Sequence, residues 1–172
     1  TNKDTVLADT IHFSYGDQTN FSPSPMATKY DAEALISFGS SLYIFTKNWT
    51  DTVSYIYQIP KAAGSYTLSV VDSIYTPGLI TGADINPKTN TLMLCGYIGI
   101  TPYLTEIPNV QFPFSSVQQT RTLVPSNFQY SRQTEAICAT NGIGFLMSSE
   151  AFLGKNAALF RVTKSTQIGI HE

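Results

Sequence analysis

The chain has 172 residues, of which 42% are hydrophobic and only 13% are charged, about half of the roughly 25% found in typical soluble domains. Lys and Arg total 10 against 12 Asp and Glu, so the formal net charge is −2. The sequence has no basic stripe, which makes nucleic acid an unexpected partner. The length suits one domain with a hydrophobic core, and no apolar run reaches the roughly 18 residues of a membrane-spanning segment.

The first predicted element is a leading strand within residues 5–15, where Ile11, Phe13 and Tyr15 alternate with polar side chains. A loop rich in turn residues follows over residues 16–28. Residues 30–47 then read YDAEALISFGSSLYIFTK, with apolar alternation on both sides of a Gly-Ser-Ser turn. This pattern predicts two strands joined by a tight turn.

Two further strands are expected at residues 53–60 and 66–75, which completes a unit of four short strands. The opening pattern returns as TGADINPKTNTLMLCGY and again as TEAICATNGIGFLMSSE, so that Ala34, Ala83 and Ala136 align at steps of roughly 50 residues. Third strands follow in the same relative place, at 103–108 and 157–162. Helical periodicity is absent, apart from one expected turn of helix at residues 150–156.

The predicted fold is therefore all-β and β-propeller-like, with about three four-stranded antiparallel blades and a leading strand in a single domain. The blades are expected at approximately residues 30–77, 78–127 and 128–172. Three blades alone form an open arc with exposed faces and edges. We therefore expect either an N-terminal half outside this chain or closure by self-association.

Both cysteines, Cys95 and Cys138, lie inside apolar strand-like runs and are expected to be buried thiols. A disulfide or a metal role is the alternative for this pair.

Five segments together carry a resemblance to a known group of proteins. They read IHFSYGDQTNFSPSP, YDAEALISFGSSLYIFTKNW, IYQIPKAAGSY, ITGADINPKTNTLMLCGY and QTEAI with SSE. The set resembles exported bacterial β-propeller-like proteins of unknown function, many of which look like cargo of the type IX secretion route. The resemblance implies a secreted, cell-surface or periplasmic protein, and it matches the later half of a longer propeller.

Acidic residues recur near the predicted starts of the innermost strands. Asp31 and Glu33 lie there in the first unit, and Asp84 and Glu135 lie near the equivalent places in the next two. Converging carboxylates are typical Ca²⁺ ligands, so Ca²⁺ is the one cofactor we consider. The alternative is that each carboxylate accepts hydrogen bonds from backbone N–H groups nearby.

Catalysis has weaker support in the sequence. Glu33 and Glu135 supply the two carboxyls that glycoside hydrolysis needs, but the only histidines, His12 and His171, lie near the two ends of the sequence, and no Gly-x-Ser-x-Gly motif occurs. Aromatic residues in the predicted strands could bind a ligand, but they could equally pack between blades. Trp49 lies in a polar loop and is therefore the best candidate for an aromatic binding platform.

Lys47 and Glu150 occupy equivalent strand ends and are interpreted as solvated rim charges unless they contact a ligand. The candidate ligand-binding residues are Asp31, Glu33, Trp49, Asp84, Glu135 and Glu150. The first functional hypothesis is a non-catalytic binding or scaffold module for a glycan or a protein. The alternatives are a hydrolase or lyase that uses these carboxylates, and a structural repeat stabilised by Ca²⁺.

Overall fold

The computed structural model describes residues 7–117, 121–123 and 133–163, and this part of the chain is all-β apart from the short 3₁₀ helix η1 (Phe114–Ser116). No helix among these residues is long and apolar enough to cross a membrane. The strands are β1 (Ile11–Tyr15), β2 (Ala32–Phe38), β3 (Ser41–Thr46), β4 (Val53–Pro60), β5 (Gly64–Leu68), β6 (Val70–Tyr75), β7 (Leu79–Asn86), β8 (Thr91–Ile98), β9 (Thr101–Pro108), β10 (Arg121–Leu123), β11 (Thr134–Ala139), β12 (Phe145–Ser149) and β13 (Ala158–Val162).

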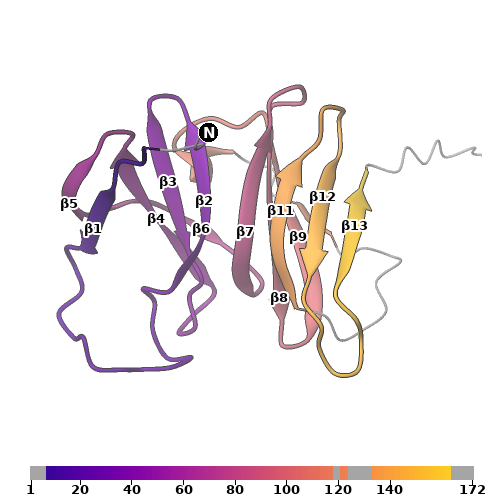
Figure 1. Cartoon of the computed structure of the whole chain (residues 1–172), viewed down its shortest axis with the longest axis horizontal. Coiled ribbons are helices and arrows are strands. Elements are labelled where there is room, and N and C mark those ends of the chain that lie inside the picture. The colour runs from indigo at the N-terminus through magenta and orange to yellow at the C-terminus, as the bar shows by residue number, and fades with distance from the viewer. Residues whose placement is uncertain (1–6, 118–120, 124–132, 164–172) are drawn as a thin grey trace, which may run out of the picture.

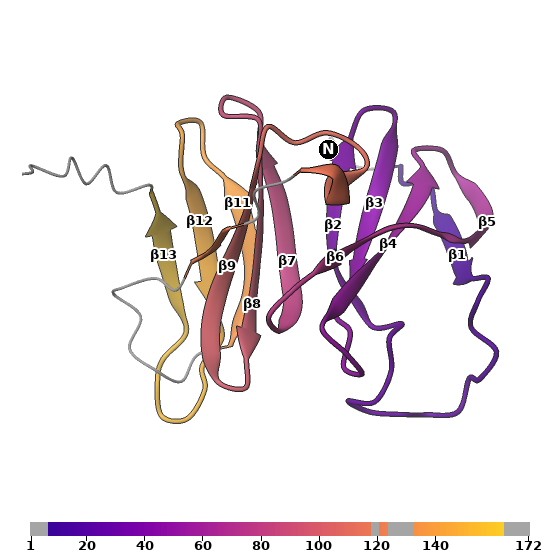
Figure 2. The same ribbon diagram turned by 180° about the vertical axis from the view of Figure 1, so that it is seen from behind.

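Three antiparallel sheets follow one another in chain order. The first sheet has the strand order β2-β3-β4-β6, the second β7-β8-β9-β10 and the third β11-β12-β13. A separate pair, β1 with β5, is parallel. Figure 1 and the reverse view in Figure 2 show the sheets side by side along the long axis, with β7 between β2 and β11, both of which it contacts.

The first strand of each sheet carries a β-bulge near its start. The register against the neighbouring strand shifts between Ala32 and Ala34 in β2, between Ile80 and Gly82 in β7, and between Thr134 and Ala136 in β11. A bulge inserts one unpaired residue and re-aims its side chain. The same irregularity in the same place shows that the three sheets are structural repeats.

The bulges correct the predicted alignment of the repeats, because Gly82, and not Ala83, is the equivalent of Ala34 and Ala136. A Cβ atom on Gly82 would lie 3.1 Å from the Cα of Ala136 and 3.1 Å from the Sγ of Cys95. The second and third sheets approach each other so closely here that a side chain at this position would need its neighbours to move.

Both faces of the second sheet are buried. Leu92 and Leu94 of β8 point into a core shared with the first sheet, whereas the alternate residues Met93 and Cys95 point into a core shared with the third. A strand buried on both faces reads as a continuous apolar run, which explains the segment LMLC. Each such side chain contributes about 2 kcal/mol through removal of apolar surface from water.

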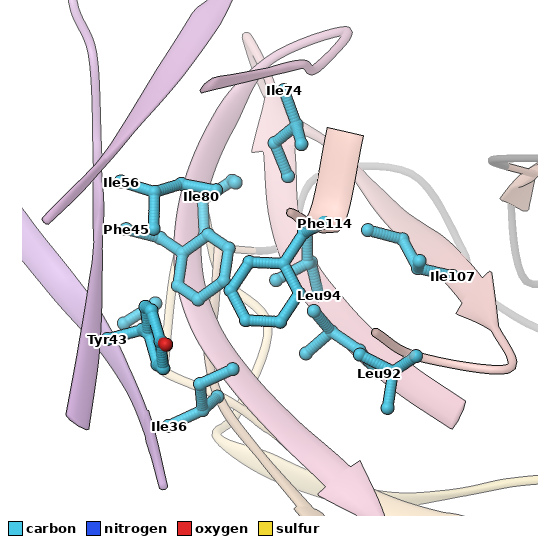
Figure 3. Close-up of a cluster of buried hydrophobic side chains, with 12 residues drawn as sticks. Ile36, Tyr43, Phe45, Ile56, Ile74, Ile80, Leu92, Leu94, Ile107 and Phe114 are labelled. Atoms are coloured by element: carbon cyan, nitrogen blue, oxygen red, sulfur yellow. The ribbon is translucent and has the colours of Figure 1, made fainter. Parts of the chain in front are cut away.

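An aromatic plug closes the core between the first and second sheets. Figure 3 shows the ring of Phe114 from η1 beside that of Phe45 from β3, and their centroids lie 5.7 Å apart. Phe38 and Tyr43 also meet Phe114 edge to face. The Pro- and Phe-rich segment after β9 therefore fills the space between these two sheets.

Residues 66–75 were predicted as one strand, but the structure has two. β5 ends at Leu68, β6 begins at Val70, and Ser69 lies between them. β5 leaves the first sheet and pairs with β1, while β6 pairs with β4. The separate pair places Ile11 and Tyr66 over Ile44 and Tyr57 on the outer face of the first sheet. Burial of that face explains why the strand divides.

Three smaller predictions are also corrected. Residues 150–156 contain no helical turn but a tight reversal closed by hydrogen bonds between Phe152 and Lys155. Cys95 is buried as expected, whereas Cys138 is an exposed free thiol. The third sheet has three strands in the part that the structure describes, and residues 164–172, where a fourth was expected, lie outside it.

Candidate functional site

The bulges bring side chains from all three sheets to one end of the stack, the lower end in Figure 1. The unpaired residue of each bulge lies there. On the second strand of each sheet, the residue just after the one paired at the bulge lies there as well. We call this place the bulge end, and its residues are Glu33, Thr81, Glu135, Lys47, Tyr97 and Glu150.

Lys47 lies at the centre of the bulge end. Its Nζ atom is 2.9 Å from Oε1 and 3.0 Å from Oε2 of Glu33. The same atom lies 5.1 Å from the ring centroid of Trp49 and 5.2 Å from that of Tyr97. The interpretation of Lys47 as a solvated rim charge is wrong, because only 7% of its side chain is exposed, against 33% for Glu33.

The ammonium group of Lys47 is held in its charged form. Burial acts to lower the pKa of Lys47, but the hydrogen bond to Glu33, the contact with Tyr97 and the charge of Glu33 outweigh burial, so the pKa is raised above its ordinary value. An aromatic ring on each of two sides adds a further attraction for the cation.

Glu135 and Glu150 bring two more carboxylates from the third sheet into the same electrostatic environment. Burial raises the pKa of Glu135; Lys47 acts in the opposite direction, and the charges of Glu33 and Glu150 raise it further. The charged groups of the first and third sheets therefore interact, although Glu33 and Glu135 are about a hundred residues apart in the sequence.

Hydroxyl groups fix the backbone between the second and third sheets at this end. The Thr81 hydroxyl donates to the carbonyl of Thr134, and the Thr134 hydroxyl donates to the carbonyl of Gly96 at 2.7 Å. All three residues lie at or beside a bulge. The bulge end is therefore built on sheet backbone, which favours a preformed site.

Asp31 positions Trp49. The indole Nε1–H donates to the Asp31 carboxylate at 2.9 Å, and the Trp49 backbone N–H donates to the carbonyl of Thr28 at 3.1 Å. The backbone N–H of Lys47 donates to the Asp31 carbonyl at 2.7 Å, which extends the pairing of β2 and β3. The half-buried indole is thus held in one orientation beside the Lys47 ammonium.

Asp84 is not part of this group. It lies nearer the other end of β7, as the equivalent of Ile36, and faces the third sheet. Its carboxylate accepts hydrogen bonds from the backbone N–H of Ile85 at 2.8 Å and of Ala139 at 2.7 Å. For Asp84 the alternative interpretation, satisfaction of backbone donors, describes the structure.

The described residues contain no group of three or more His, Cys, Asp or Glu side chains placed to hold a metal ion. The expected cluster of four carboxylates is therefore not assembled in this part of the chain. The positive charge among Glu33, Glu135 and Glu150 comes instead from the Lys47 ammonium.

Beside Asp31 lies an open hollow of about 510 Å³ between the loop before β2 and the loop after β3. Amides and hydroxyls dominate its lining, which consists of Gln18, Asn20, Ser22, Ser24, Ala27, Thr28, Lys29, Tyr30, Asp31 and Thr50. Sequence reasoning missed this hollow, although the polar residues between Gly16 and Thr28, among them Gln18, Asn20 and Ser22, were a usable signal. It also missed the contact of Tyr97 with Lys47, although Tyr97 lies one repeat after Lys47 in the sequence.

No protein-family model matches this chain, and no curated protein matches it at a significant level. The bulge end and the adjoining hollow are the features of the described chain that can take part in binding. Together they offer a fixed indole, a buried ammonium, two partly exposed carboxylates and a set of neutral hydrogen-bonding groups.

Proposed function

We propose that the three sheets are blades of the β-propeller type and that the chain is a non-catalytic binding or scaffold module that holds a glycan at its bulge end. Adjacent, equally bulged first strands support the propeller architecture. The resemblance of the sequence segments described above favours an exported or cell-surface bacterial protein.

The observation that carries the binding proposal is the fixed indole of Trp49 next to a polar hollow. Asp31 both holds the indole and lines the hollow, and Thr50, the residue after Trp49, lines it as well, so the indole lies next to the hollow. Sugars present hydroxyl groups and apolar C–H faces, which amide and hydroxyl side chains and an aromatic ring complement. Gln18, Asn20 and Thr50 supply the polar part of that surface.

Binding is favoured over catalysis because two of the candidate carboxylates already serve the site itself. Both oxygens of Glu33 contact Lys47, and the Asp31 carboxylate accepts from Trp49. A glycoside hydrolase needs two carboxyls that face the scissile bond, one of them ready to donate a proton. A carboxylate that an ammonium holds in its ionised form is poorly suited to donate that proton.

The chain contains a single tryptophan, so its fluorescence reports directly on this site. Titration with neutral oligosaccharides is expected to change the emission of Trp49 saturably, and Trp49→Ala is expected to abolish binding in calorimetry. Tyr75→Ala removes an exposed aromatic residue from the edge strand β6 and serves as the control that leaves binding unchanged. Absence of binding to a broad oligosaccharide panel contradicts the glycan proposal. The hypothesis to test is then that the module binds a protein.

The second candidate is a glycan-active hydrolase or lyase, and the raised pKa of Glu135 is the observation that favours it. A carboxyl that stays protonated nearer neutral pH is suited to general-acid catalysis. Under this alternative, Glu135→Gln abolishes turnover of an oligosaccharide that the protein still binds. Under the binding proposal, neither the wild-type protein nor Glu135→Gln releases product.

A further inference from the structure

Within the described chain, neither outer face of the three stacked antiparallel sheets has a further antiparallel sheet beside it, and the first sheet is covered there only in part, by the pair β1–β5. Alternate side chains of a strand point to opposite faces of its sheet. Along β7, Ala83 and Ile85 pack towards the first sheet, whereas Gly82 and Asp84 contact the third. Each sheet thus has one face directed to the preceding sheet and one to the following sheet.

The preceding-side face of the first sheet is partly open. Leu35 is the equivalent of Ala83 and Ile137, which both pack against the sheet before them, yet Leu35 is 53% exposed. It lies in an apolar groove of about 450 Å³ between β1 and β2. The lining is Asp9, Ile11, Phe13, Ala32, Glu33, Ala34, Leu35, Leu42, Ile44 and Ile59. The parallel pair of β1 and β5 covers only the part of this face that lies over β3 and β4.

Among the described residues, no strand covers the following-side face of the third sheet either. By the same alternation its residues are Ala136, Cys138, Leu146, Ser148, Leu159 and Arg161. Leu159 is 68% exposed. Its first strand presents the small residue Ala136, as β2 presents Ala34 and β7 presents Gly82 where the next sheet approaches. This face therefore has the form of the two faces that already make sheet-to-sheet contacts.

We propose that the groove between β1 and β2 receives the third sheet of a second copy of this chain, with β11 of one copy beside β2 of the other, as β11 lies beside β7 within one copy. The third-sheet face offers the small residue Ala136 and the exposed Leu159, and the groove offers the exposed Leu35. Arg161 on one face also complements Asp9 of the groove in charge.

Each copy carries both faces, so two copies close on each other through two such contacts. Three antiparallel sheets from the described part of each copy then make a ring of six sheets, and closed propellers have roughly four to eight blades. The inference rests on the blade-like stacking proposed above and not on the glycan site, so the two proposals fail in separate experiments.

A cross-link tests the contact directly. In the existing interface the carboxylate of Asp84 meets the backbone of Ala139, and the equivalent pair across the new contact is Cys138 of one copy and Ser37 of the other. Ser37→Cys is expected to give a reducible dimer when dissolved oxygen with a copper catalyst takes two electrons and two protons from the thiol pair. Ser73→Cys, exposed on β6, is the matched control that stays uncross-linked, and Ser37→Cys combined with Cys138→Ser loses the dimer.

The solution mass supplies the second measurement. Light scattering of the wild-type chain, 18.9 kDa as a monomer, is expected to give about twice that mass. Leu35→Glu, at a largely exposed position, is expected to give a folded monomer, while Tyr75→Glu, 68% exposed on β6, remains dimeric. A wild-type monomer overturns the proposal and leaves the groove to another polypeptide. A dimer that Ser37→Cys fails to cross-link overturns it as well.

Discussion

Lys47→Met removes the buried ammonium while keeping an unbranched side chain of similar length. In the wild type, Nζ contacts both oxygens of Glu33 and lies over the rings of Trp49 and Tyr97. The apolar stem of lysine already packs in the protein, and methionine preserves that packing. The substitution therefore isolates the contribution of the charge.

The expected loss of stability follows from the burial of the two partners. Breaking a fully buried ion pair costs about 3 to 5 kcal/mol, because the remaining charge stays desolvated. The side chain of Glu33 is 33% exposed and recovers part of its hydration, so we expect a loss of about 2 kcal/mol. For a chain of this size that corresponds to a decrease in melting temperature of about 4 to 8 °C.

Urea unfolding of wild type, Lys47→Met, Glu33→Gln and the double variant measures the effect. The double variant is expected to lose less free energy of unfolding than the two single losses combined, with a coupling of about 1 kcal/mol. The pair Lys29–Asp17 is the control, since it has the same 2.9 Å separation but side chains that are each 36% exposed, and Lys29→Met should cost at most about 1 kcal/mol. Strict additivity at Lys47 and Glu33, or an equal loss at Lys29, refutes this reasoning.

Three further predictions concern the sheets and their side chains. Gly82→Ala is expected to destabilise the fold by about 1 to 3 kcal/mol in thermal unfolding, because its Cβ would meet backbone of the third sheet at 3.1 Å, whereas Gly142→Ala meets only a hydroxyl at 3.7 Å and should be near neutral. The Cys95 thiol, whose pKa burial raises to about 12, should stay unlabelled by thiol reagents at pH 8 in a Cys138→Ser protein until it unfolds; rapid labelling of the native state contradicts its burial. Addition of EDTA should leave the melting temperature unchanged, and a clear decrease would restore the Ca²⁺ hypothesis.

Local patterns predicted the individual strands well. The alternation in residues 34–46 and the run Val53–Pro60 correspond to β2, β3 and β4, the last with the same bounds. Strand formation depends here on near neighbours and on which side chains face the core, and both are visible in the sequence. The all-β class followed from the same signals.

The features that depend on contacts between sheets were not predictable in the same way. Gly82 has no side chain to mark its equivalence with Ala34, so the predicted alignment was off by one residue and matched Asp84 with Leu35 instead of Ile36, on the opposite face of the sheet. The burial of Lys47 depends on Tyr97 of the next sheet, fifty residues away. Such a partner becomes visible only after the repeats are superposed by their bulges.

Convergence of the three sheets on one electrostatic site is the central claim, and the pKa of Glu135 tests it most directly. Because burial raises that pKa in the folded state, the contribution of Glu135 to stability is fully present below the ordinary carboxyl pKa and is lost as the pH rises through the raised value. Glu135→Gln should therefore become the more stable protein relative to wild type above that range.

The decisive measurement is an NMR titration of the Glu135 side-chain carboxyl in the wild type and in Lys47→Met. We predict a raised pKa in the wild type and a further increase in the variant, because the ammonium that favours the carboxylate is gone while Glu33 and Glu150 remain. An identical pKa in the two proteins would mean that Lys47 and Glu135 do not share a site, and the proposed bulge-end site would be contradicted.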